Sequence, residues 1–347
     1  MKILLFIPDI YSLKGSIING FTELGHEVIS IDYRHYHPGW FLRAKRRSSK
    51  LNNTIRDRLD FHYYNDVNKK HLEIYNREMS VDIVVIYNHE LFSPETIKIM
   101  KRESKIIFYL GDNPYYSPGN DYNLAVLLQA DLIASPDTFW NKQISLLGAK
   151  NIIFSILGYN ENSNYIYSPT IEETNQYSSD IVYVGTNYKS SWGYKRTLFL
   201  SQFAHLDTKI FTHGPSWSKW LKHFPELEDN IVIRRNRMSD RELNTILNCC
   251  KIYPVDANPG LLNGLHIRIF DCIASGILPI VEYRDDLDIV FKGVEIPSIR
   301  NYLLAESIAK KYLNDDSLRE STSSILQEFV KSNYSPKITI RNIISHL

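Results

Sequence analysis

The chain has 347 residues, more than one ordinary hydrophobic core accommodates, so two domains are expected. Hydrophobic residues make up 44% and charged residues 23% of the chain, which is typical of a globular protein and excludes a disordered or fibrous one. The formal net charge of +1 excludes a protein that coats nucleic acid through a strong overall field. The cysteines, Cys249, Cys250 and Cys272, lack metal-ligand spacing and are typical of a reducing compartment.

The chain opens with a short apolar run, residues 2–7, that we interpret as a first β-strand. The run is too short for the apolar region of a secretory signal, and no small-residue cleavage site follows it. No uninterrupted apolar stretch of about 18 residues occurs in the sequence. The sequence therefore predicts a cytoplasmic protein without a membrane-spanning segment.

Short β-branched apolar runs alternate with longer amphipathic stretches, the pattern of parallel sheets covered by helices. A polar segment without apolar periodicity, residues 158–179, divides these runs into two sets. We therefore predict an α/β fold with two Rossmann-like domains, residues 1–168 and 169–347, and a boundary near Pro169. The expected strands are 2–7, 27–32, 83–87, 105–110, 132–135 and 152–157 in the first domain, and 181–185, 209–212, 231–234, 252–254 and 278–282 in the second.

Local signals mark several helix ends. We expect a helix over residues 12–24. It would end before Gly25, and a glycine at this position is typical of a helix C-terminus. Ser239, followed three residues later by Glu242, forms a capping box at the start of a helix over residues 240–249. Residues 303–347 are almost entirely helical with a break at Ser335, and the last helix can cross back to the first domain.

A basic segment runs from Arg43 to Arg58, with seven Lys or Arg residues and one acidic residue, Asp57. On an exposed helix such a segment attracts anionic lipid headgroups or an anionic glycan, and each charge contributes about 1 kcal/mol at a membrane surface. Peripheral contact with the inner face of the membrane is one prediction. An ordinary solvated helix explains the same composition.

Two polar groups follow predicted strands of the first domain. Asp112 comes after the strand 105–110, and His89 comes after the strand 83–87. Open α/β sheets bind ligands at the carboxyl ends of their strands. Either Asp112, with its pKa raised by burial, or His89 can serve as a general base, and the sequence does not choose between them. An Asp that caps the following turn is the alternative for Asp112.

The most informative stretch is NGLHIRIFDCIASGILPIVEY, residues 263–283. We expect a helix that begins near Asn263, so that its N-terminal N–H groups, with Gly264, face an anionic phosphate. Arg268 would add a charge-assisted pair to a diphosphate. Asp271, eight residues after Asn263, would accept hydrogen bonds from ribose hydroxyls. Arg and Asp at this spacing are equally typical of a surface ion pair.

This stretch resembles the C-terminal signature of the CgeB/YkvP-like glycosyltransferases of the group 1 type, in which N-G-x-x-x-R-x-F-E-x-x-A-x-G precedes an apolar strand. The family usually has Glu at the position of Asp271. In the wider retaining glycosyltransferases a donor-contacting carboxylate occupies the position of Asn263, so both retaining and inverting chemistry stay open. The matching residues are Asn263, Gly264, Arg268, Phe270, Asp271, Ala274 and Gly276.

The resemblance extends over most of the second domain. Residues 181–196 resemble the family's opening strand and loop, which implies that Gly185, Thr186 and Arg196 approach the donor phosphates. Residues 210–217 resemble a strand and loop that face the nucleotide, which implies contacts from His213 and Gly214. A loop histidine without a role is the alternative for His213.

The resemblance implies a GT-B fold, with two Rossmann-like domains facing across a cleft. It implies a nucleotide-sugar donor on the second domain and a glycan, lipid-linked or protein acceptor on the first, in bacterial surface polysaccharide or glycoconjugate synthesis. No cofactor and no obligatory metal are expected, since no Asp-x-Asp pair stands in a suitable loop.

The sequence leaves one other class of protein open and disfavours a second. A non-catalytic nucleotide or glycan sensor on the same scaffold remains the alternative, because a fold does not fix a function. A dinucleotide enzyme is disfavoured, since Pro8-Asp9-Ile10 stands where G-x-G-x-x-G would follow the first strand.

Overall fold

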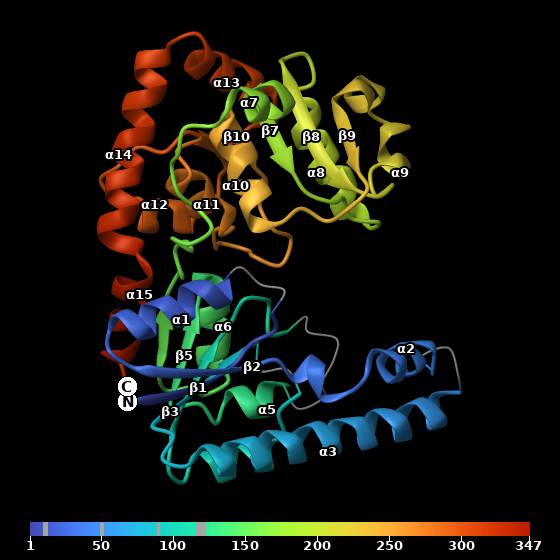
Figure 1. The fold of residues 1–347 in the computed structure, drawn as a ribbon, viewed down its shortest axis with the longest axis vertical. Coiled ribbons are helices and arrows are strands. Elements are labelled where there is room, and N and C mark those ends of the chain that lie inside the picture. Colours follow the sequence, from blue (N-terminus) through green and yellow to red (C-terminus); the bar gives the residue numbers. More distant parts are fainter. Residues whose placement is uncertain (10–12, 49–51, 89–90, 116–122) are drawn as a thin grey trace. The chain divides into compact units, whose positions relative to one another are not determined.

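The structure, a computed structural model, describes residues 1–9, 13–48, 52–88, 91–115 and 123–347 (Figure 1). Its internal contacts divide the chain into two compact units. Unit 1 comprises Met1–Ile156 and Pro336–Leu347, and unit 2 comprises Leu157–Ser335. Each unit contains a six-stranded parallel sheet, which confirms the predicted α/β fold with two Rossmann-like halves.

The sheet of unit 1 has the strand order β2-β1-β3-β4-β5-β6. All six strands predicted for the first half of the chain are present. Ile3, Leu4 and Leu5 of β1 are completely buried, because helices cover both faces of a parallel sheet. The strands are β1 Lys2–Phe6, β2 Glu27–Ile31, β3 Ile83–Tyr87, β4 Lys105–Tyr109, β5 Leu132–Ser135 and β6 Ile152–Phe154.

The helices of unit 1 differ in how much of their length packs on this sheet. In the longest helix, α3, the buried residues Val67, Asn68, His71 and Tyr75 all lie in the second half. The His71 ring stacks on Phe92 with the ring centres 4.2 Å apart. The helices are α1 Leu13–Glu23, α2 Gly39–Ser48, α3 Asn53–Glu78, α4 Pro94–Met100, α5 Asn123–Leu127, α6 Thr138–Leu146 and α15 Pro336–Ile344, with a 3-10 helix at Tyr33–Tyr36.

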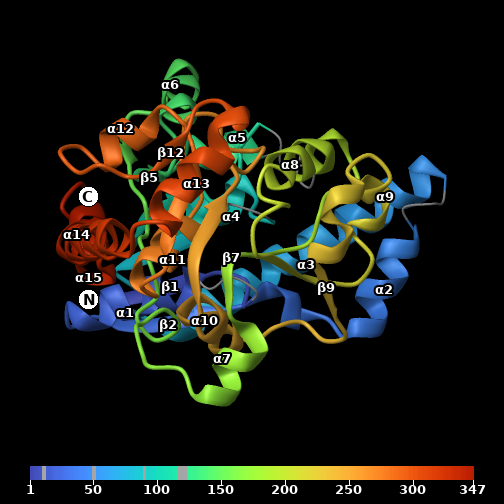
Figure 2. The same ribbon diagram turned by 90° about the horizontal axis from the view of Figure 1, so that it is seen from above.

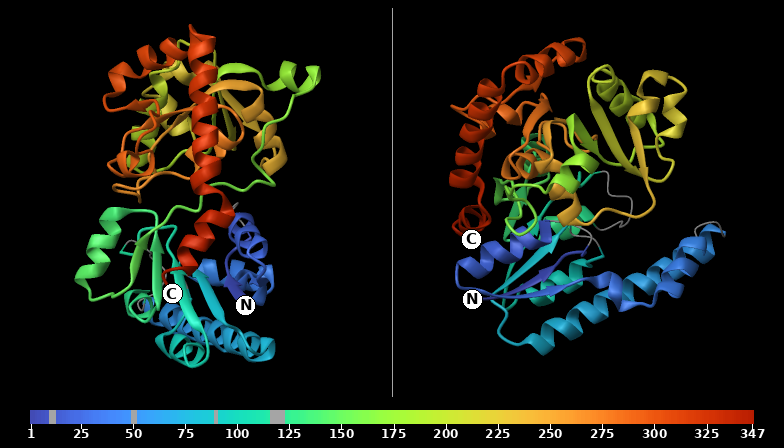
Figure 3. Two further views of the ribbon diagram at one scale, coloured as in Figure 1. Left: turned by 90° about the vertical axis from the view of Figure 1, so that its left-hand side faces the viewer. Right: turned by 45° about the horizontal axis from the view of Figure 1, so that its top comes forward.

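The last helix, α15, packs beside α1 in unit 1 (Figure 3). The close approach depends on Gly20 of α1. A Cβ atom at this position would meet the Ile340 side chain and would lie 2.5 Å from the carbonyl oxygen of Pro336. The final helix therefore completes the first unit, as the sequence allowed.

The sheet of unit 2 has the order β12-β11-β10-β7-β8-β9. In Figure 2 its two edge strands, β12 and β9, lie on opposite sides of β7. The five predicted strands are present, and the sixth, β12, was missed because two residues carry no periodic pattern. The strands are β7 Ser179–Val184, β8 Thr208–His213, β9 Ile231–Arg234, β10 Cys250–Val255, β11 Leu278–Glu282 and β12 Ser298–Ile299. The helices are α7 Ile171–Tyr177, α8 Ser191–Ser201, α9 Ser218–Leu221, α10 Asp240–Asn248, α11 Arg268–Ala274, α12 Asp286–Val290, α13 Ala305–Leu313 and α14 Asp316–Tyr334, with 3-10 helices at Pro225–Asn230 and Tyr302–Leu304.

The compact units divide after Ile156, whereas the sequence placed the boundary near Pro169. The intervening polar segment lies on α10 instead of linking the units. The side-chain amides of Asn244 and Asn248 both donate to the carbonyl oxygen of Tyr165 at 3.0 Å. Amide–backbone bonds of this kind leave no apolar periodicity, so the sequence pattern alone indicated a linker. Within the described residues, no helix is both long and apolar enough to cross a membrane.

We predict that Gly20→Ala destabilises unit 1 by about 1–3 kcal/mol, because the added methyl group overpacks the contact between α1 and α15. Gly39→Ala serves as the control, because within the described residues the nearest atom to the added methyl group would be Arg43 Nη1, at 3.5 Å. Urea unfolding followed by circular dichroism measures the difference. Equal midpoints for the two variants would contradict the assigned packing.

Candidate functional site

A cavity of about 220 Å³ lies in unit 2 at the carboxyl ends of two adjacent strands, β7 and β10. Parallel α/β sheets bind ligands at this edge. The loop after β7, helix α8 and the segment leading into α11 supply the other walls. The lining residues are Tyr183, Val184, Gly185, Thr186, Tyr188, Arg196, Tyr253, Val255, Asp256, His266 and Arg268.

A buried ion pair forms one wall of the cavity. Arg196 Nε donates to Asp256 Oδ2 at 2.8 Å, and Arg196 Nη1 donates to the carbonyl oxygen of Thr186 at 2.6 Å. The Tyr183 hydroxyl donates to the other carboxylate oxygen, Asp256 Oδ1, at 3.0 Å. The guanidinium carbon lies 4.4 Å from the centre of the Tyr188 ring. Burial opposes the charge of Arg196, but Tyr183 and Asp256 raise its pKa above the ordinary value, so it stays cationic.

A second guanidinium, that of Arg268, reaches the cavity from the first residue of α11. Its Nη1 lies 3.5 Å from Asp271 Oδ2. Asp271 is itself buried and does not line the cavity. Burial raises the pKa of Asp271 to about 6, although Arg268 acts in the opposite direction. Asp271 therefore contacts the site through Arg268.

His266 places a neutral ring in the same cavity. Its Nδ1 accepts the backbone N–H of Arg268 at 3.0 Å, so the neutral ring carries its hydrogen on Nε2. Burial, together with repulsion from Arg268, lowers the pKa of His266 to about 4. Two guanidinium groups and one carboxylate thus line the cavity at neutral pH, and this excess of positive charge favours an anionic ligand.

The structure brings together four of the residues predicted from the sequence: Gly185, Thr186, Arg196 and Arg268 line this cavity. The expected helix start near Asn263 is wrong, since α11 begins at Arg268. The first helical hydrogen bonds go to the carbonyl oxygens of His266 and Ile267. Asn263 and Gly264 precede that turn and do not line the cavity, and the carbonyl oxygen of Asn263 accepts the N–H of Asp286 at 3.1 Å.

His213 and Gly214 lie at the end of β8, outside the lining of the cavity. His213 is exposed, and Gly214 has a φ of +69°, which favours glycine. Trp217 in the same loop is buried, and its Nε1 donates to the carbonyl oxygen of Gly185 at 3.1 Å. This loop therefore supports Gly185 from behind.

Sequence reasoning missed five polar residues of the cavity. Asp256 comes two residues after the predicted strand 252–254, as Asp112 does after the strand 105–110, so the same signal could have found it. His266 lay inside the motif that matched the family but was not among its matching positions. The three tyrosines give no sequence signal that separates them from core aromatics. They are Tyr183, Tyr188 and Tyr253.

In unit 1, Asn88 fixes the loop that carries Asp112. The Asn88 backbone has a φ of +60°, and its Oδ1 accepts the N–H groups of Gly111 at 2.6 Å and Asp112 at 3.0 Å. Its Nδ2 donates to Asp112 Oδ2 at 2.8 Å. Burial raises the pKa of Asp112 from its ordinary value, although the bond from Asn88 lowers it. His89, the other candidate base, lies outside the described residues.

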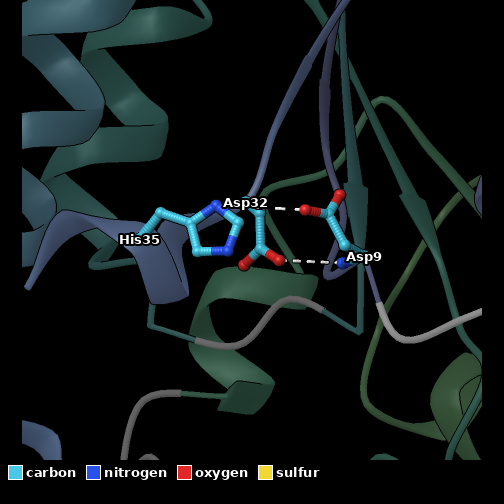
Figure 4. Close-up of side chains that lie close together, drawn as sticks. All are labelled: Asp9, Asp32 and His35. Carbon is cyan, nitrogen blue, oxygen red and sulfur yellow. Dashed lines mark hydrogen bonds and ion pairs between the residues drawn. The ribbon is translucent and has the colours of Figure 1, made fainter. Parts of the chain in front are cut away.

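A further polar cluster joins the ends of β1 and β2 (Figure 4). The Asp9 N–H donates to Asp32 Oδ2 at 2.8 Å, and ligand atoms of Asp9, Asp32 and His35 lie within 4.8 Å of one another. Arg34 and Lys14 already pair with the two carboxylates. Burial favours a protonated Asp32, but hydrogen bonds from Arg34 and Asp9 hold its pKa well below the usual range. We interpret the cluster as a structural contact that holds the loop after β1 against the loop after β2.

Comparisons with known proteins agree with the two-unit α/β fold. The family model described as "Glycosyl transferase-like" matches residues 195–345. No match was found among curated proteins.

Solved structures similar to the chain span both units. Anabaena Alr3699/HepE in complex with UDP-glucose is 12% identical, with 100% of each chain covered and a TM-score of 0.65. Sucrose-phosphate synthase from Thermosynechococcus elongatus is 10% identical, with 99% of this chain and 98% of that chain covered and a TM-score of 0.67. The E. coli trehalose-6-phosphate structure bound with UDP-2-fluoro glucose is 10% identical, with coverage of 100% and 99% and a TM-score of 0.65. At this identity the likeness establishes the fold, which is GT-B.

We predict that Asp256→Ala destabilises unit 2 by about 3–5 kcal/mol, because it leaves the Arg196 guanidinium buried without its carboxylate. Asp180→Ala is the matched control. Asp180 forms an exposed ion pair with Lys251 at 2.8 Å, and loss of such a pair costs about 1 kcal/mol or less. Urea unfolding measures both, and equal losses would contradict the structural role of the buried pair.

We also predict a pH dependence from His266. Because its pKa is about 4 in the folded chain and 6.5 ordinarily, the unfolded chain binds a proton between these values that the folded chain does not. The contribution of His266 to stability is therefore lost as pH falls from 6.5 towards 4, by up to about 1.4 kcal/mol per pH unit. The raised pKa of Asp271 acts in the opposite direction between about 6 and 3.8.

The variant His266→Asn keeps an acceptor for the Arg268 N–H but cannot titrate. As pH falls over this range, the variant should therefore gain stability relative to wild type, since the titration of Asp271 is common to both chains. The difference between variant and wild type at pH 8, where both side chains are neutral, gives the cost of the substitution itself. Parallel curves of unfolding free energy against pH would show that His266 is not buried as described.

Proposed function

We propose that the chain is a glycosyltransferase that moves a sugar from a nucleotide-sugar donor to an acceptor hydroxyl. The observation that carries this proposal is the pair of guanidinium groups, Arg196 and Arg268, in one cavity at the carboxyl edge of the unit 2 sheet. The family match over residues 195–345 supports it. So do the GT-B neighbours whose structures hold UDP-glucose or UDP-2-fluoro glucose.

The cavity suits the diphosphate of such a donor. Its volume of about 220 Å³ is below the roughly 300–1,000 Å³ of a pocket for a drug-sized ligand, so the nucleoside and the sugar would extend beyond it. We propose that Arg196 and Arg268 stabilise the departing diphosphate, since prepositioned cations act most strongly where charge develops. His266 Nε2 would add a hydrogen bond without further charge. On this proposal no metal and no cofactor beyond the donor are required.

The remaining donor contacts stay predictions. Asp271 was predicted to hold the ribose, and in the structure its carboxylate faces Arg268. Contacts from Asn263, Gly264, His213 and Gly214 rest on the resemblance alone.

We propose that unit 1 binds the acceptor and that Asp112 is the general base. Asp112 is exposed, yet desolvation by the surrounding loop raises the pKa of its carboxyl, which brings the carboxylate closer to the strength that a base needs near neutral pH. His89 is the second candidate. The acceptor class we propose is a glycan, a lipid-linked sugar or a protein of the bacterial surface, modified from the cytoplasmic side, and the stereochemical outcome stays open.

We predict that Arg268→Ala weakens donor binding by about 10- to 100-fold, because a charge-assisted hydrogen bond contributes roughly 1.5–3 kcal/mol. A panel of UDP-, GDP-, dTDP- and CMP-sugars identifies the donor by thermal stabilisation of the wild-type chain, and titration calorimetry then compares variants. Arg300→Ala removes an exposed guanidinium from the same unit and should leave donor affinity unchanged.

Slow hydrolysis of the same donor distinguishes the enzyme from a sensor on this scaffold. The hydrolysis is measured as release of the nucleoside diphosphate or monophosphate. Stabilisation without hydrolysis or transfer would favour the sensor. If Arg268→Ala bound and hydrolysed the donor like wild type, the cavity would not be the donor site.

A further inference from the structure

Helix α2 and the first half of α3, residues 53–66, form a hairpin without a core beneath it. All buried residues of α3 lie beyond residue 66. Figure 1 shows this end of α3, together with α2, projecting past the edge of the unit 1 sheet. The surface of the hairpin is therefore determined by its own side chains.

The inner faces of the two helices pack on each other. The His37 ring stacks on Phe41 with centres 4.8 Å apart and lies 5.1 Å from the Tyr63 ring. Lys45 Nζ lies 4.6 Å from the centre of the Tyr63 ring and 2.6 Å from Asp60 Oδ1. These contacts hold α2 against α3. The exposed side chains of the hairpin are therefore not needed to stabilise it.

Four large apolar side chains of the hairpin remain in water. Trp40 is 64% exposed, Phe61 61%, Ile55 51% and Leu59 44%. Single exposed apolar side chains are common on soluble proteins. Several within one short hairpin indicate a surface that binds a membrane or another protein.

Basic side chains accompany these apolar groups. Residues 39–62 contain seven Lys or Arg and two Asp, in a chain whose net charge is only +1, so the rest of the chain is net negative. Asp57 pairs with Arg56 and Asp60 pairs with Lys45. Exposed cations without a carboxylate at ion-pair distance in the described parts of the chain are Arg43, Arg47 and Arg58.

We propose that this hairpin docks on the surface of an anionic phospholipid bilayer. Trp40 and Phe61 would enter the interface between headgroups and acyl chains, and the free arginines would bind the headgroups. A symmetric dimer through the same patch would bring the cations of two copies together, which opposes association. An anionic glycan would pair with the arginines but would leave Ile55 and Leu59 in water.

Docking of this kind would bring unit 1, the proposed acceptor unit, to a lipid-linked acceptor. The docking itself does not rest on the proposed donor chemistry. Vesicle binding requires no donor, and donor binding requires no vesicle, so the two proposals fail separately.

The test is co-sedimentation of the full chain with vesicles of phosphatidylcholine alone or with added phosphatidylglycerol. We expect binding to the anionic vesicles only, weakened by salt. Arg43→Glu with Arg47→Glu should lower the partition coefficient about tenfold or more, since each charge contributes at an anionic surface. Lys98→Glu with Arg102→Glu makes the same charge change on exposed residues around the end of α4 and should bind like wild type.

The apolar contribution is tested with Trp40→Ala combined with Phe61→Ala, for which we expect about a tenfold loss of binding at unchanged net charge. Retained circular dichroism and an unchanged thermal unfolding midpoint show that a variant is folded. Equal binding to both kinds of vesicle, or wild-type binding by the Arg43/Arg47 variant, would overturn the proposal. So would light scattering that shows a wild-type dimer and a monomeric Trp40/Phe61 variant, because the patch would then belong to a second copy.

Discussion

Arg196 and Asp256 join parts of unit 2 that are far apart in the sequence. The carboxylate follows β10, the guanidinium comes from α8, and the Tyr183 hydroxyl of β7 completes the contact. A charge enclosed by protein is tolerated only when its partner is placed well, so the neighbouring loops must keep their shape as long as the pair exists. The same bonds that hold these loops also define the walls of the cavity. The Arg196–Asp256 ion pair therefore determines both the fold of these loops and the shape of the cavity.

The electrostatics of the cavity follow from how its groups are paired. Asp256 is shared between Arg196 and Tyr183, and Asp271 lies behind Arg268, so the positive charge is only partly compensated toward the ligand side. His266 would add a third positive charge if it were protonated. Desolvation and the neighbouring guanidinium groups of Arg268 and Arg196 prevent this at neutral pH, and the half-buried ring remains a neutral donor. The site can therefore bind an anion through two guanidinium groups, without the electrostatic repulsion that a third cation would add.

The regular elements were predictable from the sequence, because their burial determines the residue pattern. Strands such as β1 and β3 are covered on both faces and read as continuous apolar runs. The segments between them depend on single hydrogen bonds, which leave no periodic signal. The start of α11 is set by carbonyl groups of His266 and Ile267, and residues that follow the first unit are held on α10 by two asparagines. The resemblance to the glycosyltransferase family identified Arg196 and Arg268. It did not identify Asp256, whose role is to pair with Arg196.

The return of α15 to unit 1 makes unit 2 an insertion in the sequence of unit 1. During synthesis from the amino terminus, all strands of the first sheet emerge before the helix that covers Gly20 and its neighbours on α1. Unit 2, by contrast, is one continuous segment and has all its residues available earlier. Unit 2 can therefore fold once its own residues have emerged, while unit 1 keeps one side of α1 uncovered until α15 follows.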